Sequence, residues 1–218
     1  MTASSEETQL TPFQIDVAQR FFAMPESDGF LSAGGAGLLA QHLTHRPTQD
    51  LDFFTRTSSG VPAARDEFEA LAEGQGWTVE RIHDAETFCR IVVTGDEALL
   101  IDLAVDSPPQ LPPSVSFLGP TFAPAELAAR KVLALFDRAE ARDFADVYEL
   151  NKIFDRGALV AQAAELDLGF TTGLLAERMG ALSRFADSDI PLAAAAVPAM
   201  PQYFDAWRKD LLGRRTAN

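Results

Sequence analysis

The chain has 218 residues, one cysteine and a formal net charge of −14, with 47% hydrophobic and 23% charged residues. These proportions are typical of a globular protein. The single cysteine, Cys89, excludes an internal disulfide and fits a small core residue, and the acidic balance counts against a general nucleic-acid binder. The polar start is no signal peptide, and the longest apolar stretch, IPLAAAAVPAM, is too short to span a bilayer. Composition thus predicts a soluble cytoplasmic protein.

The chain opens with a polar segment, residues 1–9, that we expect to be disordered. A helix follows, because Thr11 and Pro12 supply an N-cap and a proline at the first helical position. It should run to about Ala23. Its phenylalanines and valine recur at helical spacing, which predicts that this helix packs on a sheet.

The next stretch, residues 30–54, predicts a strand, a glycine turn, a short helix starting near Gly37, a loop and a second strand. Gly34 and Gly35 lack a Cβ atom, so that their backbone amides can approach a ligand closely. The amides at the start of the short helix would suit a phosphate group. This stretch therefore predicts a nucleotide-binding turn.

The second strand carries two aspartates in the sequence DLDFF. Because side chains alternate along a strand, Asp50 and Asp52 should project to one face while Leu51 and Phe53 project to the other. Two adjacent carboxylates repel each other unless a cation lies between them. Mg²⁺ prefers oxygen ligands and tolerates phosphates in its coordination shell, so the pattern predicts a magnesium site.

A helix over residues 62–73 and three strands over 77–82, 87–93 and 98–105 follow, with a hairpin turn at 95–97. The third strand, LLIDLAVD, places one carboxylate, Asp102, between apolar neighbours. We expect a functional acid there. The alternative is an aspartate at the edge of its strand and exposed to water.

Prolines dominate residues 107–124, which we interpret as a linker unable to continue a sheet or a helix. The predicted organisation is an α+β lobe over residues 1–120 and a helical lobe over 121–218. The helical lobe should contain helices at 124–137, 142–154, 157–166, 172–185 and 202–213.

A second group of charged residues lies in the helical lobe. Lys131 borders the apolar stripe of its helix, so its stem can be buried while the amine reaches a ligand. Asp143 and Asp146 are three positions apart and share a helical face. Asp146 could hold Lys131 or orient an acceptor. The alternative is a purely structural set of ion pairs between the two helices.

Together, the GG turn with its short helix, the DLDFF strand and the single aspartate in an apolar strand resemble the nucleotidyltransferase superfamily with the DNA-polymerase-β-like fold. The segment GGAGLLAQHLTHRPTQDLDFF and the later K…RDxxD segment are similar to those of the AbiEii/AbiGii toxin-type nucleotidyltransferases. The resemblance spans roughly residues 28–154. It implies a mixed sheet with flanking helices, followed by the helical lobe.

The resemblance also implies a magnesium-dependent enzyme that transfers an NMP from an NTP. Asp50, Asp52 and Asp102 would hold the metal, and Asp102 would also help to activate the attacking hydroxyl. Lys131 would neutralise the triphosphate, with Asp146 as the matching helix aspartate and Asp143 as the second choice. Gly34 and Gly35 would contact the nucleotide, with Arg46 a minor phosphate contact.

The implied acceptor is RNA, with the 3′ end of a tRNA as the expected case. The implied role is the toxin of a toxin–antitoxin or phage-defence pair, with an antitoxin as partner. Two alternatives remain: a small-molecule nucleotidyltransferase of the aminoglycoside-modifying type, which the acidic charge favours, and a non-catalytic nucleotide-binding module. A local basic surface for RNA would comprise Arg178, Arg184, Arg208, Lys209, Arg214 and Arg215.

Overall fold

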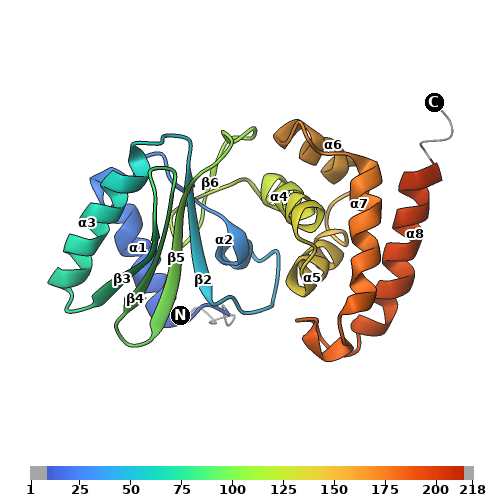
Figure 1. Cartoon of the computed structure of the whole chain (residues 1–218). Coiled ribbons are helices and arrows are strands. Elements are labelled where there is room, and N and C mark those ends of the chain that lie inside the picture. Colours follow the sequence, from blue (N-terminus) through green and yellow to red (C-terminus); the bar gives the residue numbers. More distant parts are fainter. Residues whose placement is uncertain (1–8, 214–218) are drawn as a thin grey trace, which may run out of the picture. The chain divides into compact units, whose positions relative to one another are not determined.

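The computed structural model describes residues 9–213. The predicted disordered start falls almost entirely on residues 1–8, outside this range. The chain divides into two compact units, residues 1–124 and 125–218 (Figure 1). The division comes four residues after the predicted end of the α+β lobe.

The N-terminal unit is a seven-stranded mixed sheet with helices packed against it, as predicted. Its strand order is β3-β4-β5-β2-β1-β7-β6. The helices are α1 (Pro12–Ala23), α2 (Gly34–Ala40) and α3 (Gly60–Gly74). The strands are β1 (Leu31–Ser32), β2 (Asp50–Thr55), β3 (Thr78–Asp84), β4 (Phe88–Thr94), β5 (Ala98–Val105), β6 (Ser114–Val115) and β7 (Pro120–Thr121).

Helix α1 begins where the sequence predicts. The Thr11 side chain accepts a hydrogen bond from the Gln14 amide at 3.1 Å, and the Gln14 side chain accepts one from the Thr11 amide at 2.8 Å. This reciprocal pair is a capping box. On the buried side of the helix, Phe21 stacks on Phe53 of β2 with ring centroids 4.3 Å apart. The helix is therefore held both at its start and along its apolar face.

One face of the sheet carries the hydrophobic core. Leu51 and Phe53 of β2 are fully buried, as are Ile91 of β4 and Ile101 and Leu103 of β5. They join buried side chains of α1 and α3, which lie beside each other against the strands in Figure 1. Since side chains alternate along each strand, burying these residues directs Asp50, Asp52 and Asp102 to the other face.

The linker prediction for residues 107–124 is wrong. Two short strands form in this passage: β6 pairs with β7 in an antiparallel arrangement, and β7 pairs with β1 in parallel through Ser32 and Thr121. Each strand has only two residues, so too few alternating positions exist for a strand pattern to appear in the sequence. Pro120 has no backbone N–H to donate, but proline is tolerated at the first position of a strand, where Pro120 lies.

The C-terminal unit is helical, as predicted, and begins within α4. Figure 1 shows α7 and α8 running side by side, in agreement with their close packing. The predicted helix over 172–185 is α-helical only to Met179 and continues as a 3₁₀ helix to Arg184. The α-helices are α4 (Pro124–Asp137), α5 (Ala141–Leu150), α6 (Arg156–Leu166), α7 (Thr172–Met179) and α8 (Met200–Gly213).

Over residues 9–213, none of the helices combines the length and the apolar character needed to cross a bilayer.

Candidate active site

Asp50 and Asp52 project from the same face of β2 and are half-buried, while Leu51 between them is fully buried. The predicted alternation is therefore present. Strand β5 runs parallel to β2, and the register places Asp102 directly beside Asp52. Neighbouring strands lie about 4.8 Å apart, so the two carboxylates share one face across adjacent strands.

Helix α2 starts at Gly34, three residues earlier than predicted, and both glycines belong to its first turn. Gly34 has a φ of +59°, a conformation that glycine adopts without strain. A Cβ atom there would lie 2.7 Å from Cγ of Asp52 and closer still to its Oδ2. The missing side chain thus makes room for the Asp52 carboxylate next to the backbone at the start of α2.

Gly35 makes room for a different side chain. A Cβ atom at Gly35 would lie 2.5 Å from the Thr48 hydroxyl oxygen, with an Arg46 nitrogen 3.6 Å away. The Thr48 hydroxyl donates to Oδ1 of Asp50 at 2.6 Å, and Thr48 is 8% exposed. Gly34 therefore leaves space for Asp52 itself, and Gly35 leaves space for Thr48, which holds Asp50. Thr48 is a residue that the sequence analysis did not identify.

Asp102 is buried and held by Arg90 of β4. Two parallel hydrogen bonds, at 2.8 and 2.6 Å, join the guanidinium to the two carboxylate oxygens. The bonds to Asp102 raise the pKa of Arg90, and Asp52 and Asp50 raise it further through charge. The exposed alternative for Asp102 is wrong, because only 8% of the residue is accessible to solvent.

A signal for Arg90 was present in the sequence. The predicted hairpin turn at 95–97 pairs Thr94 with Ala98. Four residues farther from the turn on each strand, the same register pairs Arg90 with Asp102. An arginine opposite an aspartate on one face of an antiparallel pair is a favourable cross-strand combination. The register of the hairpin was sufficient to predict this contact.

Within residues 9–213, no group of three or more His, Cys, Asp or Glu side chains is placed to hold a metal ion. Mg²⁺ is commonly bound by only one or two carboxylates together with substrate phosphates. Asp50 and Asp52 fit that description. Asp102 does so less directly, because Arg90 already contacts both of its oxygens.

In the C-terminal unit, Lys131 of α4 and Asp146 of α5 form a buried ion pair with Nζ and Oδ2 2.9 Å apart. The exposed fractions of the two side chains are 9% and 0%. The prediction that the Lys131 stem is buried beside the apolar stripe is correct. The structure also places the Asp146 carboxylate on this lysine, the contact that the sequence analysis offered for it.

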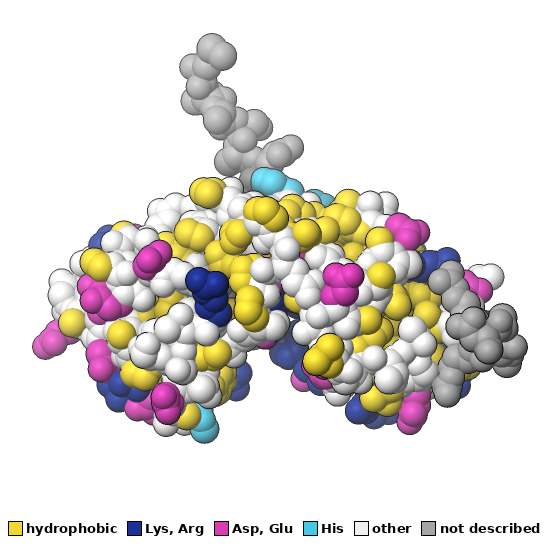
Figure 2. Space-filling view, turned by 90° about the horizontal axis from the view of Figure 1, so that it is seen from above, with side chains coloured by type: hydrophobic (Ala, Val, Ile, Leu, Met, Phe, Trp, Pro, Cys, Tyr) yellow, Lys and Arg dark blue, Asp and Glu magenta, His cyan; other side chains and the backbone are white. Residues whose placement is uncertain are grey.

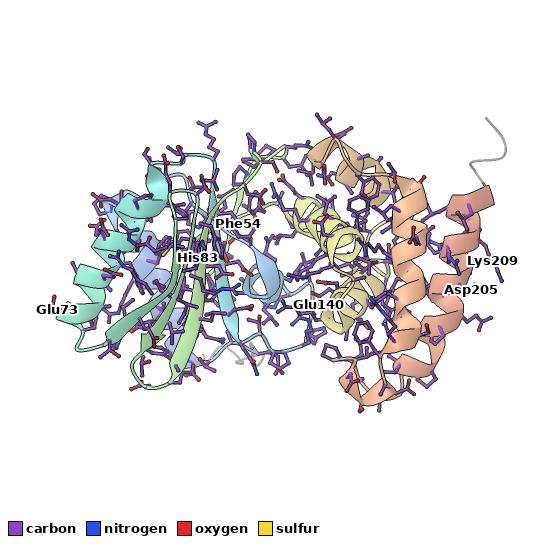
Figure 3. All side chains as sticks on the ribbon, in the orientation of Figure 1. Phe54, Glu73, His83, Glu140, Asp205 and Lys209 are labelled. Atoms are coloured by element: carbon purple, nitrogen blue, oxygen red, sulfur yellow. The ribbon has the colours of Figure 1, made fainter. Side chains whose placement is uncertain are left out.

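Asp143 has a separate set of partners. Arg138 donates to both of its oxygens at 2.9 Å, and the backbone amide of Glu140 donates to Oδ2 at 3.1 Å. Glu140, labelled in Figure 3, is the N-cap of α5. Asp143 therefore caps the helix.

The remaining predicted positions have simpler surroundings. Cys89 is fully buried, as expected of a core residue, and burial raises its pKa to about 11. Arg178 of the predicted basic surface donates to the Phe136 carbonyl, and Lys209 pairs with Asp205. Arg214 and Arg215 lie outside the described residues.

Comparison with known proteins identifies the family. Residues 19–210 match the family described as nucleotidyl transferase AbiEii toxin, type IV TA system. The chain belongs to the AbiEii nucleotidyltransferase toxin family. The match extends beyond the 28–154 region of the sequence resemblance and includes most of the helical unit. No curated protein matches the sequence closely enough to add to this.

Solved structures share the fold of this AbiEii-family chain. JHP933 from Helicobacter pylori superposes with a TM-score of 0.57 at 16% identity, covering 95% of this chain and 97% of that one. MenT4, a nucleotidyltransferase toxin from Mycobacterium tuberculosis H37Rv, superposes with a TM-score of 0.59 at 20% identity, covering 90% and 83%. At sequence identities of 16% and 20%, these similarities show a shared fold and nothing more specific.

Family membership confirms the enzyme prediction: this AbiEii-family chain is a nucleotidyltransferase of a toxin family. The type IV toxin–antitoxin classification implies an antitoxin partner.

Proposed function

We propose that the protein transfers an NMP from an NTP to an acceptor in a reaction that depends on Mg²⁺, with pyrophosphate released. The observation that carries this proposal is the placement of Asp50 and Asp52 on one half-buried face of β2, with Gly34 leaving the space for the second carboxylate. Paired oxygen ligands next to a glycine backbone suit a metal–triphosphate complex.

In this proposal Asp50 and Asp52 hold the metal, which when bound polarises the α-phosphate and neutralises charge in the transition state. Thr48 fixes the orientation of the Asp50 carboxylate through the 2.6 Å hydrogen bond. The backbone at Gly34 lies against the Asp52 carboxylate, so a triphosphate bound through the metal would come close to the start of α2. Arg46, close to Gly35, remains a candidate phosphate contact.

Asp102 is proposed to accept the proton of the attacking hydroxyl and to assist the metal. A carboxylate offers about four acceptor positions, and Arg90 uses two of them. Arg90 keeps the carboxylate oriented toward the face that it shares with Asp52. Arg90 also offsets one of the three negative charges on this face, which lets three carboxylates lie close together before a cation arrives.

Lys131 is proposed to balance the charge of the triphosphate, with Asp146 fixing its amine. The family resemblance and the burial of this pair within the helical unit support the assignment. A lysine whose amine already contacts a carboxylate at 2.9 Å is oriented before any substrate binds.

The proposed acceptor is RNA, with a tRNA 3′ end as the expected case, and the proposed setting is a toxin–antitoxin or phage-defence pair in the cytoplasm. The formal charge of −14 favours the alternative of a polycationic small molecule such as an aminoglycoside. Any RNA contact through phosphates requires a local basic surface and should weaken steeply with salt.

The first experiment compares Asp52→Asn with Asp96→Asn, which changes an exposed aspartate in the hairpin turn. Asp52→Asn should abolish transfer, and without Mg²⁺ its melting temperature should be unchanged or slightly higher, because a carboxylate repulsion is removed. Asp96→Asn should leave transfer unchanged. Transfer by Asp52→Asn at the rate of the unaltered protein would overturn the metal assignment.

A second experiment identifies the acceptor. The protein is incubated with Mg²⁺, each labelled NTP in turn, and either total RNA or a panel of aminoglycosides. Label in RNA supports the proposal, and label confined to the small molecules supports the alternative.

A further inference from the structure

The N-terminal unit contains a cavity of about 200 Å³ that the catalytic proposal does not use. Its walls come from the end of β2, the chain that follows β5, the start of β1 and Phe122 after β7. Figure 2 views this end of the unit from above and shows hydrophobic side chains at the surface beside a basic side chain. The cavity therefore has an apolar interior that opens near charged groups.

The cavity lies on the same face as the catalytic carboxylates. Phe54, which lines it, follows Asp52 by two positions on β2, so the two side chains point the same way about 6.6 Å apart along the strand. Leu31 of β1 is paired with Phe54. Asp106 continues the ladder beside β2, because its amide donates to the Thr55 carbonyl at 2.8 Å. The cavity is thus the next site along the sheet after Asp52.

Its chemistry suits a flat, uncharged, polar ring. Phe54 and Phe122 provide aromatic surface, and Pro109 and Pro113 provide further apolar walls. Arg56, Asp106 and Ser107 are the polar residues of the lining. The Ser107 amide and hydroxyl donate to Oδ1 of Asp106 at 2.7 and 3.3 Å, and the Arg56 guanidinium is a donor group. One arginine and one aspartate give the lining no net charge, which is a poor match for a phosphate group.

The size points to a fragment of a substrate. Sites for whole drug-sized molecules have volumes of roughly 300–1,000 Å³, and this cavity has about 200 Å³. The volume matches a single ring system, such as a base joined through its ribose to a phosphate that a metal holds near Asp52. Recognition of an uncharged ring also lets a protein with a formal charge of −14 bind a nucleotide with less dependence on phosphate contacts.

We propose that this cavity is a nucleobase subsite, taking either the base of the NTP or the terminal base of an RNA acceptor. The inference rests on the proposed nucleotidyl transfer at Asp50 and Asp52. Phe54, labelled in Figure 3 toward the end of β2 that leads into α3, is the stacking surface. Stacking on one aromatic ring contributes roughly 10- to 100-fold in affinity per base.

The test measures equilibrium binding of three probes in Mg²⁺: a non-hydrolysable NTP analogue, inorganic tripolyphosphate and a short single-stranded RNA. Phe54→Ala should weaken binding of the NTP analogue or of the RNA by at least about 10-fold and leave tripolyphosphate binding unchanged. A loss for the analogue assigns the site to the NTP base, and a loss for the RNA assigns it to the acceptor. Phe54→Leu keeps a large apolar side chain without an aromatic ring and takes its place if the alanine variant does not fold.

Phe117→Ala is the matched control, because Phe117 is an exposed aromatic residue of the same unit that does not line the cavity. Unchanged affinity of both Phe54 variants for the analogue and the RNA would overturn the subsite, as would an equal loss for tripolyphosphate. If the unaltered protein binds neither the analogue nor the RNA, the proposed function fails and the subsite fails with it. Failure of the subsite alone leaves binding by the unaltered protein intact.

Discussion

Replacing Gly34 by alanine tests how the second aspartate of the DxD motif is placed. Two effects are expected. An L-residue at a φ of +59° is strained by about 1–2 kcal/mol, which lowers the free energy of unfolding. The new Cβ atom would also lie 2.7 Å from Cγ of Asp52. Ordinary carbon contacts begin near ~3.5 Å and Oδ2 of Asp52 lies closer still to the new atom, so the Asp52 carboxylate has to move by more than about 1 Å.

Gly76→Ala separates these two effects. Gly76 has a φ of +77°, and a Cβ atom there would meet nothing within 4 Å. Both variants should therefore lose a similar stability, about 1–2 kcal/mol, from backbone strain alone. Only Gly34→Ala displaces a proposed metal ligand. A 1 Å misplacement of a catalytic group can lower the rate about 100-fold, and we expect a loss of that order.

The measurements are urea unfolding, Mn²⁺ binding followed by electron paramagnetic resonance, and transfer of labelled nucleotide. Gly34→Ala should bind Mn²⁺ more weakly and transfer about 100-fold more slowly, while Gly76→Ala matches the unaltered protein in both. Normal Mn²⁺ affinity and transfer in a folded Gly34→Ala protein would refute the reasoning that Gly34 makes room for a functional carboxylate.

Three further variants test the surrounding contacts. Arg90→Gln removes the charge that offsets the third carboxylate, so Mn²⁺ affinity should rise several-fold while urea stability falls; unchanged affinity would contradict this. Thr48→Val removes the hydrogen bond to Asp50. It should slow transfer roughly tenfold and lower the free energy of unfolding by about 1 kcal/mol, whereas Thr48→Ser should behave like the unaltered protein. Lys131→Met removes the lysine partner of the buried Asp146 carboxylate and should cost about 3–5 kcal/mol in urea unfolding. Adding Asp146→Leu should recover much of that stability but no transfer, and an active double variant would show that the pair is only structural.

Much of the N-terminal unit was predictable because its signals are local. The alternation in DLDFF is enough to place Asp50 and Asp52 on one face, and the apolar run around Asp102 is enough to predict a buried strand. The hairpin turn at 95–97 sets the register of two strands, and with it the contact between Arg90 and Asp102. Helix α1 carries its own start signal.

Other features depend on contacts between segments far apart in the chain. The reason that Gly34 and Gly35 lack side chains is visible only once Asp52 and Thr48 pack against them. The strands at 114–115 and 120–121 form because β7 can pair with β1 and β6 can pair with β7. The residues of a two-residue strand do not by themselves indicate such pairing.

The choice between Asp143 and Asp146 is of the same kind. Both aspartates are buried on one helix. Their spacing determined that they share a face, and the family resemblance ranked Asp146 first, but neither named the partner of Asp143. Packing of α5 beside α4 brings Lys131 to Asp146, and the turn before α5 brings Arg138 to Asp143. A buried carboxylate is retained only where it meets a partner, and the tertiary structure decides which partner each carboxylate meets.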